Sequence, residues 1–432
     1  MDLWRIRGGE RLEGECRVQG SKNAALPILA ACLLCPGTVE LRRVPRLSDV
    51  DAALRILEHL GCRVKREGER LLIDASRAQG YSIPPRLMEQ MRSTVIFMGA
   101  LLARCGRAEL SPPGGCRLGK RPIDLHLLAL RKLGANIEEG EGRILCRPAR
   151  LRGSVIRLPF PSVGATENAM LAACAAGGET EIRGAAREPE IVALQEFLQK
   201  LGAKICGAGG DRIYIRGFRP APSACFAIPS DRIAAATICC ACAACGGNIL
   251  LKDCDGRQFS TVLHFLNRAG CDIMLQNDRL RIRSARRPRA VGRVETAPYP
   301  GFPTDAQPLL MAALLRAEGE SLFRENIFEN RFRHVPQLRR LGAQIRLEGR
   351  EALVTGAEEL EGAVVESTDL RGGAAMILAG LQARGETLVW DRGHVRRGYE
   401  DLDGTLRALG AEITYEGDSH GIFVSSAEAF RG

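Results

Sequence analysis

The sequence contains few aromatic residues and lacks a long hydrophobic run. Phe, Trp and Tyr make up 5% of the 432 residues, which leaves little material for the stacking platforms that hold nucleic-acid bases. The longest apolar stretch, residues 233–245, is too short to span a bilayer, and residues 1–20 lack the apolar core of a signal peptide. We therefore expect a soluble, cytoplasmic protein with neither a membrane nor a nucleic-acid partner.

Lysine is also scarce, although the chain is basic. The formal net charge is +10, from 61 basic and 51 acidic residues, and only seven of the basic residues are lysines. Such an excess fits an anionic ligand, a nucleic acid or a solvated surface. The basic residues are scattered, with one dense run at residues 281–293. A basic RNA-binding protein is therefore a weak alternative.

Cysteine is abundant, but its surroundings argue against disulfides and metals. Most of the 16 cysteines lie among Ala, Leu and Ile, as buried reduced thiols do. Cys32 with Cys35, and Cys242 with Cys245, have the spacing of zinc ligands. Both pairs lie in apolar helical stretches without a second ligand pair, so no metal site is predicted.

The chain repeats one unit six times, with a period of about 70 residues. One series of glycines ends an apolar, helix-like stretch and precedes a short apolar run: Gly37, Gly106, Gly178, Gly247, Gly319 and Gly385. A second series ends an amphipathic stretch: Gly61, Gly134, Gly202, Gly270, Gly342 and Gly410. Each unit predicts a strand, a buried helix, a strand, a surface helix and a closing pair of strands.

Six βαβαββ units predict an α/β (α+β) protein with three units in each of two domains. We expect one lobe at residues 21–229 and the other at residues 1–20 plus 230–432. Helices without a polar face belong in a core. They are expected at residues 23–34, 94–103, 165–176, 233–244, 308–316 and 373–383. The last unit should close with a hairpin of residues 412–415 and 421–424.

Polar residues at the starts of the buried helices differ between the units. Lys22, Arg92 and Arg371 are cations at the positive end of a helix dipole. Each should share an anion with the free backbone amides there. Residues interpreted as N-caps are Thr166, Asp231 and Thr368.

The second unit departs from the repeat by a Pro/Gly-rich loop within residues 110–126. Cys116 lies in this loop near Arg117, Lys120 and Arg121, and neighbouring cations favour a thiolate. Cys116 is therefore predicted to be reactive, the alternative being an exposed loop with an incidental thiol.

The second lobe contributes a further candidate site. Asp305 follows the irregular run 299–304 and enters a buried helix, where it is either a cap or a base. Arg331, Arg371 and Arg397 could hold a carboxylate or phosphate in bidentate fashion, although a single arginine is more often a surface residue.

Nine segments together resemble the UDP-N-acetylglucosamine 1-carboxyvinyltransferases, over essentially the whole chain. The segments are 20–27 (GSKNAALP), 113–116 (PGGC), 121–126 (RPIDLH), 162–166 (SVGAT), 187–190 (REPE), 299–305 (YPGFPTD), 327–332 (IFENRF), 368–371 (TDLR) and 397–400 (RGYE). The resemblance implies a two-domain inside-out α/β barrel. It also implies transfer of the enolpyruvyl group of phosphoenolpyruvate to the 3-hydroxyl of UDP-N-acetylglucosamine, the first committed step of peptidoglycan synthesis. Phosphate is released, and no cofactor or metal is needed.

The same resemblance implies residue roles. Cys116 would donate a proton, form an adduct with phosphoenolpyruvate and react with the inhibitor fosfomycin, while Asp305 would take the proton of the hydroxyl. The implied phosphoenolpyruvate ligands are Lys22, Asn23, Arg121 and Arg397, with phosphate held by the three cations, and Arg331 and Arg371, which hold the carboxylate. The implied nucleotide-sugar contacts are Asn23, Arg92, Arg121, Pro122, Ile123, Asp124, Leu125, Ser162, Val163, Gly164, Asp305 and Ile327.

Three alternatives are weaker. The 3-phosphoshikimate 1-carboxyvinyltransferases resemble this fold and use the same donor, but lack the Pro-Gly-Gly-Cys loop. A catalytically silent paralogue would not be expected to keep Lys22, Cys116, Asp305 and Arg397 together, and an RNA-binding protein leaves the cysteine loop unexplained.

Ala234 and Pro112 depart from the family pattern without removing a reacting group, and so bear on loop kinetics more than on activity.

Overall fold

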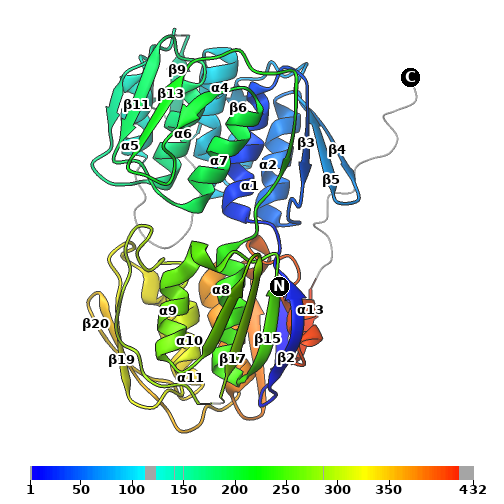
Figure 1. The fold of residues 1–432 in the computed structure, drawn as a ribbon, viewed down its shortest axis with the longest axis vertical. Coiled ribbons are helices and arrows are strands. Elements are labelled where there is room, and N and C mark those ends of the chain that lie inside the picture. The colour runs from blue at the N-terminus through cyan, green and yellow to red at the C-terminus, as the bar shows by residue number, and fades with distance from the viewer. Residues whose placement is uncertain (1, 112–122, 141, 149, 286, 418–432) are drawn as a thin grey trace. The chain divides into compact units, whose positions relative to one another are not determined.

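The computed structural model describes residues 2–111, 123–140, 142–148, 150–285 and 287–417. These residues form two compact units, one made of the chain up to Gln19 and from Ser230 onward, the other running from Gly20 to Pro229. Each unit has its own hydrophobic core and three four-stranded sheets (Figure 1). The predicted α/β class, with six repeated units, is confirmed.

The unit from Gly20 to Pro229 contains three buried and three surface helices among its described residues. The buried helices are α1 (Lys22–Ala31), α4 (Phe97–Cys105) and α6 (Val163–Ala173), and the surface helices are α2 (Ser48–His59), α5 (Asp124–Lys132) and α7 (Pro189–Lys200). Short helical turns are η1 (Cys32–Leu34), α3 (Pro85–Met88) and η2 (Arg92–Ile96). Its sheets, in strand order, are β14 (Ser223–Ala227), β3 (Thr38–Arg42), β5 (Arg70–Asp74) and β4 (Arg63–Glu67); β6 (Ser82–Ile83), β7 (Ala108–Leu110), β9 (Arg143–Arg147) and β8 (Asn136–Gly140); and β10 (Val155–Arg157), β11 (Glu179–Arg183), β13 (Arg212–Arg216) and β12 (Lys204–Cys206).

The other unit repeats this plan. Its buried helices are α8 (Arg232–Cys245), α10 (Gln307–Ala313) and α12 (Leu370–Gln382), and its surface helices are α9 (Ser260–Arg268), α11 (Val335–Arg340) and α13 (Leu402–Ala408). Three short turns are η3 (Gly256–Phe259), η4 (Arg331–His334) and η5 (Val395–Arg397). Its sheets are β2 (Leu12–Arg17), β15 (Gly247–Lys252), β17 (Arg279–Ser284) and β16 (Asp272–Gln276); β18 (Gly292–Glu295), β19 (Glu320–Arg324), β21 (Glu351–Thr355) and β20 (Gln344–Glu348); and β22 (Val364–Glu366), β23 (Glu386–Asp391), β1 (Asp2–Arg7) and β24 (Glu412–Glu416). The three buried helices pack against one another, because they have no polar face to present to water.

The second glycine series ends the surface helices by adopting a left-handed backbone. All six of these glycines have φ between 90° and 100°, a conformation that costs a residue with a Cβ atom. This explains why glycine recurs at the same point of every unit.

Two strands are exchanged where the chain passes between the units. In four repeats the strand before the buried helix pairs in parallel with the strand after it. In contrast, β2 precedes α1 but pairs with β15, and β14 precedes α8 but pairs with β3. One sheet of each unit is therefore completed by a distant strand: β14, near the end of the unit from Gly20 to Pro229, completes the sheet of β3, and β2 of the N-terminal segment completes the sheet of β15.

The sixth sheet differs from the predicted hairpin. The antiparallel partner of β24 is β1, with Ile6 opposite Ile413. In the other five sheets this position belongs to a strand of the same repeat. The expected return strand, residues 421–424, lies outside the described residues. Among the helices that the structure describes, none is both long and apolar enough to cross a membrane.

Candidate active site

Two buried arginines hold the carboxylate of Asp305. Nη2 of Arg331 lies 3.4 Å from Oδ1, and Nε of Arg371 lies 3.2 Å from Oδ2. The arginine side chains are 1% and 2% exposed, whereas that of Asp305 is 33% exposed. Asp305 is therefore the open end of a buried cationic cluster. It is not the helix cap, because the N-cap of α10 is Ala306.

Asp369 contacts both arginines and holds them in place. Its Oδ1 lies 3.4 Å from Nη1 of Arg331 and accepts hydrogen bonds from the backbone N–H groups of Arg371 and Gly372 at the start of α12. Burial is the largest single effect and opposes the charge of Asp369, but Arg331, His334 and these amides together outweigh it and hold the pKa of Asp369 below its ordinary value. Asp369 therefore anchors the pair as a carboxylate.

Arg371 remains charged but incompletely satisfied. Burial disfavours its charge, yet Tyr399, Asp305 and Asp231 outweigh burial and raise its pKa. The guanidinium carbon lies 5.3 Å from the centre of the Tyr399 ring. Among the described residues, no acceptor makes a well-formed hydrogen bond to Nη1 or Nη2, although both atoms are buried. Beyond a weak hydrogen bond with the Tyr399 hydroxyl, this buried guanidinium has donors to spare, and it is suited to an incoming anion.

The segment that carries Asp305 is held by Glu325, a residue that the sequence did not indicate. Glu325 is 1% exposed. One of its oxygens accepts from the backbone N–H groups of Ile327 and Phe328 at 2.8 and 2.9 Å. The other accepts from Oγ1 of Thr304 at 3.1 Å, and the Thr304 carbonyl accepts from Nε of Arg331 at 3.1 Å. In the sequence, the signal for this residue was a glutamate placed directly after the strand β19.

Lys22 has a partner that the helix-dipole argument did not identify. It is the first residue of α1, which is capped by Ser21. Its Nζ lies 3.2 Å from Oδ2 of Asp49 in α2, and both side chains are buried. The anion expected beside this cation is therefore supplied, at least in part, by the protein itself.

The start of α6 brings together several residues of the predicted nucleotide-sugar site. Ser162 caps the helix through the backbone N–H of Ala165 at 3.4 Å. Gly164 packs so closely against His126 of α5 that a Cβ atom there would lie 2.8 Å from Cε1 of the imidazole. Arg92, at the start of η2, acts electrostatically on the same imidazole. These three elements therefore meet at one place.

The remaining predicted residues have varied surroundings. Asn23, Ile123, Leu125, Val163, Ile327 and Arg397 are half-buried, whereas Asp124 is exposed at the start of α5. The segment after Arg397 is tied to Gln19, which donates to the Gly398 carbonyl at 3.0 Å and accepts from the Glu400 N–H at 2.9 Å. Cys116, Arg121, Pro122 and Pro112 lie outside the described residues.

One predicted N-cap is confirmed and two are wrong. Asp231 caps α8, where Oδ1 accepts from two backbone N–H groups at 2.8 and 3.0 Å. Thr166 lies inside α6, because Ser162 is the cap, and its hydroxyl instead accepts from the N–H of Ala186. Thr368 lies one residue before the true cap, Asp369. In both stretches two residues have suitable side chains, and only the backbone geometry distinguishes them.

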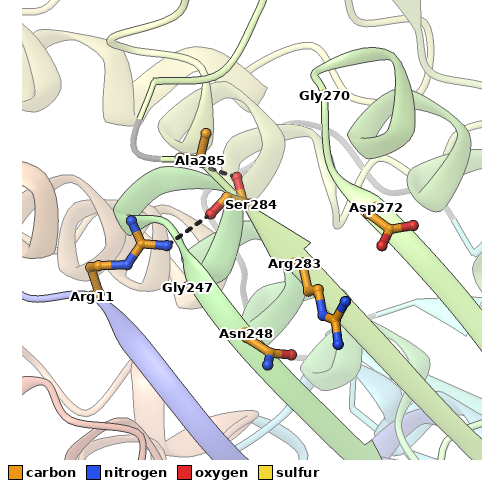
Figure 2. Close-up of a pocket in the computed structure, with 8 residues that line it drawn as sticks. All are labelled: Arg11, Gly247, Asn248, Gly270, Asp272, Arg283, Ser284 and Ala285. Atoms are coloured by element: carbon orange, nitrogen blue, oxygen red, sulfur yellow. Dashed lines mark hydrogen bonds between the residues drawn. The ribbon is translucent and has the colours of Figure 1, made fainter.

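A separate open pocket of about 340 Å³ lies at the end of the sheet formed by β2, β15, β17 and β16 (Figure 2). It is lined in part by Arg11, Asn248, Asp272 and Arg283, and Arg11 donates to the Ser284 carbonyl at 3.4 Å. None of the predicted site residues lines it. Among the described residues, no group of three or more His, Cys, Asp or Glu side chains is arranged to hold a metal ion.

Comparison with known proteins identifies the family of the chain. The sequence family described as EPSP synthase (3-phosphoshikimate 1-carboxyvinyltransferase) matches residues 6–420. UDP-N-acetylglucosamine 1-carboxyvinyltransferase 2 of Caldanaerobacter subterraneus is 46% identical, covering 96% of this chain and 99% of that protein. The protein of the same name from Carboxydothermus hydrogenoformans is 44% identical, covering 96% of this chain and 99% of its own length.

Solved structures confirm the fold. The enolpyruvyl transferase NikO of Streptomyces tendae superposes with a TM-score of 0.86 at 24% identity, covering 96% of this chain and 98% of NikO. An EPSP synthase of Acinetobacter baumannii gives a TM-score of 0.74 at 19% identity, covering 96% of this chain and all of that protein. From its full-length sequence similarity, this chain belongs to the family of UDP-N-acetylglucosamine 1-carboxyvinyltransferases.

Proposed function

We propose that this protein transfers the enolpyruvyl group of phosphoenolpyruvate to the 3-hydroxyl of UDP-N-acetylglucosamine and releases phosphate. The family relationship supports the choice of reaction. The structural observation that carries the proposal is Arg371, whose two buried terminal nitrogens are available beside Arg331 and Asp305. Two guanidinium groups can hold the carboxylate of phosphoenolpyruvate in a fixed orientation.

The charges of the donor would be divided between two sets of cations. Arg331 and Arg371 hold the carboxylate. Lys22, Arg121 and Arg397 hold the phosphate, with Asn23 as a further contact. The geometry supports the carboxylate site, because the two buried arginines already lie around one carboxylate, that of Asp305. The phosphate site is supported by the resemblance to the family motif.

The chemistry needs one base and one acid. The sugar oxygen adds to C2 of phosphoenolpyruvate while C3 gains a proton; C3 then loses a proton, the C2–O bond to phosphate breaks, and the vinyl ether forms. Asp305 takes the proton of the hydroxyl, and Cys116 supplies the proton to C3. The partly exposed carboxylate of Asp305 suits contact with substrate, and the arginines stabilise the charge that develops.

The acceptor would be held mainly by the unit from Gly20 to Pro229. Its contacts are Asn23, Arg92, residues 121–125 and residues 162–164, with Asp305 and Ile327 from the other unit. The two catalytic lobes correspond to residues 21–229 and to residues 1–20 plus 230–432. We place the enzyme in the cytoplasm, where we expect both substrates to be available.

Phosphate release from phosphoenolpyruvate tests the proposal. The purified protein is assayed with UDP-N-acetylglucosamine, with shikimate 3-phosphate and without acceptor, each before and after treatment with fosfomycin. We expect phosphate release when UDP-N-acetylglucosamine is the acceptor and in neither of the other two assays. Treatment with fosfomycin, an epoxide, should abolish it. Release only with shikimate 3-phosphate would identify the other branch of the EPSP synthase family. No release with either acceptor would favour a catalytically silent paralogue.

A further inference from the structure

A buried amide in the unit from Gly20 to Pro229 fixes the state of a histidine that no part of the proposed reaction uses. Asn168 of α6 is fully buried and His126 of α5 is 8% exposed. Nδ2 of Asn168 lies 2.7 Å from Nδ1 of His126. The two residues are 42 positions apart in the sequence and meet because α5 packs on α6.

Backbone groups determine which way the Asn168 amide faces. Its Oδ1 accepts from the backbone N–H of Gly99 at 2.7 Å, and its Nδ2 donates to the carbonyl of Val95 at 2.9 Å. A backbone N–H cannot accept and a carbonyl cannot donate, so exchanging the amide oxygen and nitrogen would lose both bonds. The second hydrogen of Nδ2 is therefore directed at His126.

It follows that Nδ1 of His126 is an acceptor. A neutral imidazole with an unprotonated Nδ1 carries its hydrogen on Nε2. Burial, assisted by the charge of Arg92, lowers the pKa of His126 to about 4, so the ring is neutral at pH 7. The chain thus maintains a single tautomer, with the Nε2–H as its remaining donor.

The free edge of this ring faces the first turn of α6. A Cβ atom on Gly164 would lie 2.8 Å from Cε1 and 3.2 Å from Nε2. The hydrogen bond that the described residues give this ring is made through Nδ1 and not through Nε2. The N-terminal amides of α6 and the cation of Arg92 make the same place attractive to an anionic oxygen.

We propose that His126, held as the Nε2–H tautomer by Asn168, donates a hydrogen bond to a diphosphate oxygen of the nucleotide sugar, and that Asn168 is the positioning residue. The role rests on the proposed function, since it deepens the recognition of that acceptor. The neutral Nε2–H of His126 would set the direction of the hydrogen bond to the diphosphate, while Arg92 contributes positive charge.

The first test reads the tautomer in the free protein. Long-range ¹H–¹⁵N correlation spectra at pH 7 should show Nε2 protonated and Nδ1 unprotonated for His126. In Asn168→Ala the fixed preference should be lost. A wild-type spectrum with the hydrogen on Nδ1 would overturn the proposal whether or not the enzyme is active.

The second test measures UDP binding by calorimetry. Loss of a hydrogen bond to a charged oxygen predicts that His126→Phe weakens UDP binding roughly 10- to 100-fold. His126→Gln, which keeps an N–H donor, should recover part of the loss. Gly164→Ala, which displaces the ring without changing it, should weaken binding as well. The matched control is His264→Gln, an exposed histidine of the other unit, which should bind UDP as wild type does.

The outcomes separate the two proposals. UDP binding that is equal in wild type, His126→Phe and Gly164→Ala would overturn the role of His126 and leave the proposed function standing. Failure of wild-type protein to bind UDP would overturn both. If His126→Phe does not fold, Gly164→Ala and His126→Gln carry the same comparison.

Discussion

The carboxylate of Asp305 accepts a hydrogen bond from Nε of Arg371 at 3.2 Å while its other oxygen lies 3.4 Å from Arg331. The base assigned to the hydroxyl thus lies against the cations assigned to the substrate carboxylate. A substrate carboxylate that engages these arginines must share them with Asp305 or displace it. Binding of the donor and release of the base would then be coupled.

This coupling predicts opposite effects of Asp305→Asn on binding and on turnover. Phosphate release should fall by about 10²- to 10⁴-fold, because the general base is lost. Affinity for phosphoenolpyruvate should be unchanged or higher, because a competing negative charge has been removed. Steady-state assays and calorimetry measure the two effects, with the exposed Asp272→Asn as the control. Weaker phosphoenolpyruvate binding in Asp305→Asn would contradict the coupling.

The repeated framework could be predicted because its signals are local. A helix that is apolar on all sides has to be buried, and a glycine that recurs after each amphipathic stretch indicates a left-handed helix end, which the structure confirms with φ between 90° and 100°. Because the same pattern occurs six times, each copy supports the assignment of the others. The position of β1 in the sixth sheet was missed because pairing between the two ends of the chain leaves no local trace.

The site was only partly predictable, for a related reason. The residue types of Asp305, Arg331 and Arg371 indicated their chemistry, but the partners that hold them are distant in sequence. Asp49 lies 27 residues from Lys22, and Asp369 lies 38 residues from Arg331. Such pairs are set by the packing of helices and turns, so one sequence alone does not identify them.

Cys116 remains a prediction from sequence, and its environment can be tested chemically. Cys116→Ala should abolish turnover while leaving nucleotide-sugar binding largely intact, because the proton donor is lost and the binding residues are not. Fosfomycin should add to wild-type protein at one site, detected by mass spectrometry, and should not add to Cys116→Ala. Cys206→Ala is the control, since this thiol is exposed but should not react. A normal rate in Cys116→Ala would overturn its assignment.

The buried pair of Lys22 and Asp49 should matter for stability as well as for the phosphate site. Their side chains are 11% and 4% exposed, and removing one partner of a buried pair leaves an uncompensated charge. Asp49→Ala should lower the free energy of unfolding by on the order of 3 kcal/mol in urea titrations. It should also raise the KM for phosphoenolpyruvate, because Lys22 loses a fixed position.

An exposed ion pair provides the comparison for Asp49→Ala. Arg131 and Glu139 lie 2.8 Å apart with side chains 47% and 49% exposed. Glu139→Ala should leave unfolding almost unchanged, since water and salt screen such a pair. Equal destabilisation by Asp49→Ala and Glu139→Ala would show that burial does not strengthen the dependence of Lys22 on its partner.

The buried imidazole of His126 makes stability depend on pH in a specific window. Its pKa is about 4 in the folded protein, below the ordinary value near 6.5, so between these values the unfolded chain binds a proton that the folded chain does not. The free energy of unfolding should therefore fall as the pH is lowered, by on the order of 2 kcal/mol at pH 5 from this group. Urea titrations at pH 7 and pH 5 should show a smaller decrease for His126→Gln than for wild type, and a wild-type decrease for His264→Gln. Equal decreases in all three proteins would mean that His126 becomes protonated in the folded state as readily as in the unfolded one, and the hydrogen bond from Asn168 would then not hold the ring neutral.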